Sequence, residues 1–139
     1  MGKSYKHIKA MQQPDTTSCW STTMSWWTHT IPFIKDYSEL DILDMYNNLT
    51  GSDGGLHMWG FEMMLKDPAW GMTVKTLSDM TTISTKVKEG LKIGPVVCGY
   101  WDPSVGGRHA VALYDADKNG PNIWAMDPNG GKHVQRSMS

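Results

Sequence analysis

The pattern of the chain changes at Gly94-Pro95, and this change limits the folds that the sequence can adopt. Before it, apolar residues recur at helical spacing; after it, short apolar and β-branched segments alternate with turn residues. The predicted helices cover 19–28, a segment that begins at 39, 58–65 and 82–92, and the predicted strands cover 96–101, 109–114, 122–126 and 133–136. Helices followed by strands favour an α+β domain, with an N-terminal helical half packed on a C-terminal antiparallel β-sheet.

Two turn clusters separate the last three predicted strands. The first, 115–121, begins at Asp115 and predicts a hairpin; the second is 129–131. Asp115 to Gly120 imitate the opening of a calcium loop, but Met126 stands at the twelfth position, where that loop needs a bidentate glutamate. We therefore expect a hairpin turn and no calcium.

Length and charge limit the class of protein. The chain has 139 residues without an internal repeat or a linker, so we expect one domain over 1–139. Thirteen basic residues stand against fourteen acidic ones, which disfavours a nucleic-acid partner held by a strong positive field. No apolar run approaches the roughly 20 residues that span a bilayer, so we expect no membrane partner either.

The N-terminal residues bear on localisation. Lys3, Lys6 and Lys9 precede no apolar stretch, so the sequence predicts no cleavable signal peptide. The expected location is the cytoplasm, or a target cell reached through a specialised secretion system.

The two cysteines, Cys19 and Cys98, are too few for a disulfide framework or a cysteine-rich zinc site. One bridge between them stays open as an alternative. Cys98 lies on an apolar predicted strand and is expected in the core. Cys19 lies at the start of a predicted helix, where a thiol loses its proton more readily.

Gln13 stands six positions before Cys19, and this spacing suits acyl transfer. An amide just upstream of the helix, together with the free N–H groups at its start, can hold the oxyanion of a tetrahedral intermediate. A histidine must take the thiol proton and a polar group must orient it. His109 opens a predicted strand and Asp127 ends the neighbouring one, so the two side chains would meet if these strands pair. Cys19 is thus the predicted nucleophile, His109 the general base and acid, Asp127 the orienting carboxylate and Gln13 the oxyanion donor.

Other residues compete for some of these roles. Gln12 is an alternative to Gln13, and Asp102 and Asp115 are alternatives to Asp127, although Asp115 is expected to start a turn and Asp102 to lie in a loop. The remaining histidines have no partner pattern and are expected to be surface or packing residues. They are His7, His29, His57 and His133.

The set resembles the papain-like cysteine peptidases. Gln13 and Cys19 have the spacing of that superfamily's oxyanion glutamine and nucleophile, and Trp20 follows the cysteine as it often does there. The segments 93–97, 107–111 and 126–128 look like its compact bacterial branch, which includes leader peptidases of bacteriocin exporters and short secreted effector proteases. Two departures stand out: Arg108 lies between Gly107 and the histidine, and an aspartate stands where papain has asparagine.

The resemblance implies a papain-like fold and a hydrolase that cleaves peptide or isopeptide bonds through a thioester. Its substrate would be a protein or peptide, its biological role that of a toxin or effector, and an immunity or inhibitor protein would be its further partner; no cofactor and no metal are implied. A peptidoglycan amidase, transglutaminase or deamidase would use the same triad and stays an alternative, as does a non-catalytic tryptophan-rich binding module.

Several large or charged side chains are candidate contacts for a substrate. The candidates are Trp20 and Arg108, which adjoin Cys19 and His109 in the sequence, and Trp101 near the end of a predicted strand. Trp59, Trp70 and Trp101 fall near loop or element ends, where an apolar substrate groove or a partner surface is expected, with packing in the core or cleft as the alternative.

Overall fold

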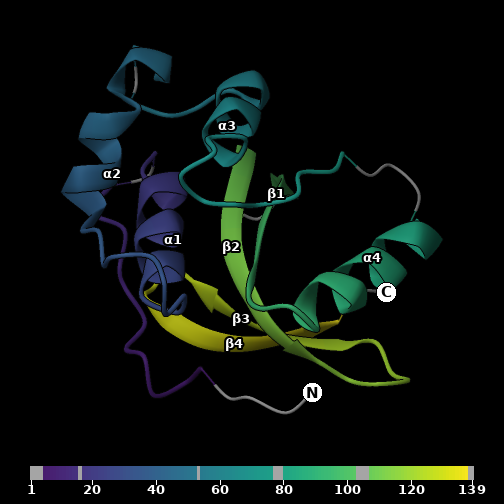
Figure 1. Cartoon of the computed structure of the whole chain (residues 1–139). Helices are drawn as coiled ribbons and strands as arrows, with labels where there is room; N and C mark the ends of the chain where they lie inside the picture. Colours follow the sequence, from purple (N-terminus) through teal and green to yellow (C-terminus); the bar gives the residue numbers. More distant parts are fainter. Residues whose placement is uncertain (1–4, 16, 53, 77–79, 103–106, 138–139) are drawn as a thin grey trace.

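The computed structural model describes residues 5–15, 17–52, 54–76, 80–102 and 107–137. These residues form an α+β arrangement of four α-helices, one short 3-10 helix and a four-stranded antiparallel sheet (Figure 1). The elements are α1 (Cys19–Thr28), α2 (Glu39–Met45), η1 (Asn47–Leu49), α3 (Met58–Leu65), α4 (Met80–Leu91), β1 (Val96–Asp102), β2 (Gly107–Ala116), β3 (Asn122–Asp127) and β4 (Lys132–Ser137). The α+β class and the antiparallel meander predicted from the sequence are confirmed.

The predicted and observed elements differ mainly at their ends. α4 begins at Met80 rather than at Thr82. The prediction that Asp115 starts the hairpin turn is wrong, because Asp115 pairs with Trp124 inside the sheet after a shift of register between Leu113 and Asp115. The shift inserts an irregularity that lets β2 continue to Ala116 before the chain reverses.

β2 lies inside the sheet and carries helices on both of its faces. The strand order is β1-β2-β3-β4, and each strand pairs antiparallel with the next. Ala110 and Ala112 pack on the side of α1, whereas Val111 and Leu113 pack with Val87 of α4 on the other side. Figure 1 shows α1 between the sheet and α2, with α4 apart from these two helices.

α1 is buried along nearly its whole length although it is rich in serine and threonine. Of its ten residues, all but Cys19 are buried. Buried hydroxyls need hydrogen-bond partners; several of those on α1 bond to backbone carbonyls, whereas Oγ1 of Thr22 has no partner among the described residues. Thr23 donates to the carbonyl of Ala110 on β2 at 3.0 Å, and Trp27 donates its indole N–H to the carbonyl of Pro95 at 3.0 Å.

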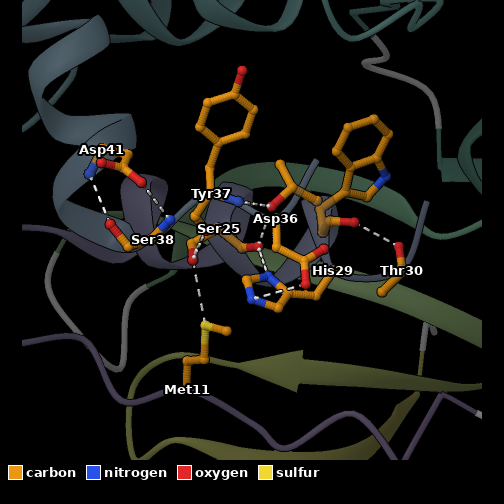
Figure 2. A network of polar contacts seen from close by, with 10 residues as sticks. Met11, Ser25, His29, Thr30, Asp36, Tyr37, Ser38 and Asp41 are labelled. Atoms are coloured by element: carbon orange, nitrogen blue, oxygen red, sulfur yellow. Dashed lines mark hydrogen bonds and ion pairs between the residues drawn. The ribbon is translucent and has the colours of Figure 1, made fainter. Parts of the chain in front are cut away.

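The segment after α1 is tied back to it by a polar network (Figure 2). The Ser25 hydroxyl donates to the carbonyl of Tyr37 at 2.7 Å, and the N–H of Tyr37 donates to the Thr28 hydroxyl at 3.1 Å. Ser38 then forms a capping box with Asp41 at the start of α2, as the sequence predicts for a serine before this helix. These bonds fix α2 against the outer side of α1.

α3 reaches the sheet through a close contact with a glycine. A Cβ built on Gly99 of β1 would lie 2.6 Å from the Phe61 ring of α3, closer than side-chain atoms approach. Among the described residues, no helix has the length and apolar character that a membrane crossing needs.

The contact between Gly99 and Phe61 gives a test of this packing. We expect Gly99→Ala to reduce the free energy of unfolding by about 1–3 kcal/mol, because the methyl group overpacks the space that the ring fills. Phe61→Leu in the same chain should recover part of that loss. Urea denaturation of the single and double variants measures this coupling.

Gly94→Ala is the matched control, since its Cβ would meet only Ile31 at 3.9 Å, an ordinary contact. A loss of stability in Gly99→Ala no larger than in Gly94→Ala would show that α3 does not pack on β1 in this way.

Candidate active site

His109 and Asp127 are brought together by the pairing of β2 with β3. Nε2 of His109 donates to Oδ1 of Asp127 at 2.7 Å, and both side chains are only 4% exposed. Because Nε2 is engaged in this bond, Nδ1 is the ring nitrogen left for a second partner. The ring of Tyr100, the register partner of His109 on β1, packs edge-on against the imidazole.

Within the part of the chain that the structure describes, the carboxylate of Asp127 accepts hydrogen bonds from three donors. Besides His109, the backbone N–H of Asn129 donates to Oδ1 at 2.9 Å and Nη2 of Arg136 donates to Oδ2 at 2.8 Å. Burial by itself raises the pKa of the Asp127 carboxyl, but these hydrogen bonds and the charges of His109 and Arg136 outweigh it and hold the pKa below its ordinary value. The carboxylate is therefore ionised at neutral pH.

Cys19 lies at the first position of α1 and interacts with His109. Burial of the ring lowers the pKa of His109, but the hydrogen bonds with Asp127 and with Cys19 and the negative charges of both outweigh it and raise the pKa to about 9. A thiol next to an imidazole that binds its proton this strongly is the arrangement that favours a thiolate–imidazolium pair. Cys19, His109 and Asp127 thus form one contiguous polar array.

The residue before α1 does not cap the helix with its side chain. Ser18 occupies the N-cap position, but within the described residues its side chain accepts no hydrogen bond from the first turn. Its hydroxyl instead donates to Oδ1 of Asp15 at 2.8 Å, and the N–H of Thr17 donates to the same oxygen at 2.9 Å. Asp15 therefore organises the loop before the helix.

Gln13 is held beside the end of β3. Its backbone N–H donates to the carbonyl of Pro128 at 3.0 Å, and its side chain is buried, with Nε2 donating to the carbonyl of Asp15 at 2.6 Å. Gly131, with a φ of +56°, lets the β3–β4 turn approach the backbone of Gln12. A Cβ built on Gly131 would lie 2.9 Å from the amide nitrogen of Gln12. Gln12 itself is exposed. Of the two glutamines, Gln13 is thus the one that is buried in the loop before Cys19 and bonded to the segment after Asp127.

The candidate substrate contacts divide into exposed and buried residues. Trp101 is 65% exposed and pairs in register with Arg108, which is also exposed and immediately precedes His109. Trp20 is 2% exposed and donates its indole N–H to the carbonyl of Gly54. We therefore revise the expectation for Trp20: its indole belongs to the core and is not accessible to a substrate.

The tryptophans near element ends likewise do not share one role. Trp59 is 66% exposed on α3, whereas Trp70 is buried, donates to the hydroxyl of Tyr46 and packs against Trp27. The single groove suggested for Trp59, Trp70 and Trp101 is therefore not formed, because Trp70 is part of the core.

Cys98 and the alternative carboxylates lie outside the array. Both cysteines are free thiols, so the alternative of a bridge between Cys19 and Cys98 is not borne out. Burial raises the pKa of the Cys98 thiol, and the side chain packs against the cluster under α4, as expected for a core cysteine. Asp102 ends β1 and Asp115 lies within β2, and neither is the carboxylate bonded to His109.

Sequence reasoning missed Arg136, which contacts the array from β4. The only signal was its place on a strand expected to pair with the strand that carries Asp127. Lys132 is the register partner of Asp127, and Arg136, four residues later, lies on the same face of that strand. In the described residues, no group of three or more His, Cys, Asp or Glu side chains is arranged to hold a metal ion.

Comparisons with family models, with curated proteins and with solved structures find no match to this chain. The interpretation of the site therefore depends on its own geometry and chemistry.

The raised pKa of His109 predicts a loss of stability at alkaline pH. The unfolded imidazole titrates near 6.5 and the folded one at about 9, so this stabilisation is present below about pH 6.5 and disappears as the pH rises to about 9. We expect the free energy of unfolding to fall over this window by up to about 3 kcal/mol. In Asp127→Asn the fall should be smaller, because the charge that stabilises the imidazolium is gone. Urea denaturation across the pH range measures it.

His133→Gln is the control for this experiment. Burial lowers the pKa of His133, so its titration lies below the window and its removal should leave the slope between pH 6.5 and 9 unchanged. Equal slopes in wild type and Asp127→Asn would contradict the role assigned to the carboxylate.

Proposed function

We propose that this protein is a cysteine peptidase of the papain-like superfamily, which cleaves peptide or isopeptide bonds through a thioester. The observation that carries the proposal is the array of Cys19, His109 and Asp127, in which a thiol at a helix start contacts an imidazole held by a buried carboxylate. An α-helix with the thiol at its N-terminus, packed on an antiparallel sheet that carries the histidine and the aspartate, is the arrangement expected of that fold.

In the first half of the reaction the proton of the Cys19 thiol passes to His109. The thiolate attacks the carbonyl carbon of the substrate, and the carbonyl oxygen becomes an oxyanion. The tetrahedral intermediate collapses when the imidazolium gives its proton to the leaving amine, so the C–N bond breaks and a thioester remains on Cys19. Asp127 stays ionised throughout and stabilises the imidazolium.

In the second half His109 takes a proton from water as the water oxygen attacks the thioester carbonyl. Collapse of the second intermediate expels the Cys19 thiolate and releases a carboxylic acid. An amine in place of water would give transfer rather than hydrolysis, and a peptidoglycan or glutamine amide in place of the peptide would give an amidase or a deamidase. These outcomes are separated by product mass after incubation with a protein library, with peptidoglycan, and with glutamine plus an amine.

The loop before α1 supports an oxyanion site. The first-turn amides receive no side-chain cap from Ser18, and the buried Gln13 amide group lies in the loop that leads into the same helix. Backbone N–H groups at a helix start and a side-chain amide are the donors that stabilise developing negative charge in acyl transfer. We assign the oxyanion contact to the amide of Cys19 and to Nε2 of Gln13.

Selective alkylation tests the proposed nucleophile. At pH 6.5 only about a hundredth of an ordinary thiol is ionised, so a Cys19 held as thiolate should react with iodoacetamide at least about tenfold faster than a model thiol. The epoxide inhibitor E-64, which resembles a peptide, should label the same residue. Mass spectrometry of the labelled protein locates the site, and Cys19→Ala should abolish both labelling and hydrolysis.

Cys98→Ser is the matched control, because that thiol is buried with a raised pKa and its loss should leave labelling unchanged. A Cys19 that reacts no faster than the model thiol, or hydrolysis that survives in Cys19→Ala, would overturn the proposal. An inert Cys19 combined with tight, stoichiometric binding of a partner would favour a non-catalytic binding module. The role as a toxin or effector stays a prediction, tested by comparing the toxicity of expressed wild type and Cys19→Ala.

A further inference from the structure

Arg136 lies on β4 and is bonded to the buried carboxylate of the candidate triad. Nη2 of Arg136 donates to Oδ2 of Asp127 at 2.8 Å, whereas Oδ1 accepts from His109 and from the N–H of Asn129. The side chain of Arg136 is 44% exposed and that of Asp127 only 4%. The guanidinium therefore covers a buried carboxylate at its boundary with solvent.

This pair differs from an ordinary surface ion pair. Exposed pairs contribute little, whereas a buried carboxylate without a countercharge is strongly disfavoured. Here the two oxygens of Asp127 have separate partners, so a rotation of the carboxylate that freed Oδ1 from His109 would also break the bond from Arg136 to Oδ2. The guanidinium thus gives the Asp127 carboxylate a countercharge and a second hydrogen bond that holds its orientation.

We propose that Arg136 is a positioning residue of this site, which keeps the Asp127 carboxylate ionised and oriented toward Nε2 of His109. The inference rests on the proposed function, because the imidazole aligned in this way is the proposed general base. Arg136 acts through Asp127 and touches no reacting atom.

The charged and titratable groups around the array set the direction of its pH response. The Tyr100 hydroxyl, whose pKa burial and nearby carboxylates raise to about 12, is neutral over the working range. Removing a cation raises the pKa of the acids around it. As the pH is lowered, the thiolate–imidazolium pair should therefore be protonated already at a higher pH when the guanidinium is absent. Among the described residues the groups concerned are Cys19 from α1, Tyr100 and Asp102 from β1, His109 from β2, Asp127 from β3 and Arg136 from β4.

The test is the pH profile of Cys19 alkylation by iodoacetamide, measured between about pH 3 and 9 on the full chain carrying Cys98→Ser. We expect Arg136→Met to move the acid limb of the profile up by about one pH unit. Arg136→Lys, which keeps the charge, should restore the limb to near its original position. Lys118→Met removes one charge from the exposed β2–β3 turn and should not move it.

The alkylation experiment separates a failure of this inference from a failure of the proposed function. A wild-type Cys19 that is inert at every pH overturns the proposed function, and this inference with it. If the wild type is reactive and its acid limb is the same in Arg136→Met, this inference alone is overturned. The same holds if the acid limb of Arg136→Lys shifts as far as that of Arg136→Met. A structural role for Arg136 would lower the melting temperature without moving the limb. Should Arg136→Met not fold, Arg136→Gln gives the same reading.

Discussion

The burial of α1 is the constraint on which the rest of the structure depends. A helix this rich in hydroxyl groups is stable inside a protein only where those groups find acceptors. Thr23 finds one on β2, and Ser25 finds one in the segment that leads to α2. Sliding or rotating the helix would break these bonds together, so its position against the sheet is fixed. The thiol of Cys19 is fixed together with the helix. It lies at the N-terminal end of α1 and is only partly buried.

The candidate site assembles from elements that are distant in the sequence. α1 carries the thiol, β2 the imidazole and β3 the carboxylate, while β4 supplies the guanidinium that covers it. The loop with Gln13 joins the two ends of this assembly, because its backbone bonds to Pro128 just after Asp127 and its chain continues into α1. The array thus connects sheet and helix through polar bonds.

Local signals in the sequence predicted most of the elements. The serine before α2 and the turn residues that bound the apolar strand segments are local signals, so these elements could be placed without tertiary information. The meeting of His109 with Asp127 followed from the expected pairing of two strands across one hairpin. The shift of register that keeps Asp115 in β2 could not be predicted, because it depends on how the strands twist together. Nor could the burial of Trp20 and Trp70 or the bond from Arg136, since each depends on contacts between distant elements.

The proposed chemistry requires the thiol of Cys19 to be hydrogen-bonded to the imidazole of His109. NMR titration of the His109 ring in wild type and in Cys19→Ala tests it most directly. We expect a pKa of about 9 for the imidazole of the wild type and a clearly lower one in Cys19→Ala, because the hydrogen bond and the charge interaction with Cys19 that raise it are removed. The same titration curve in both proteins would contradict it.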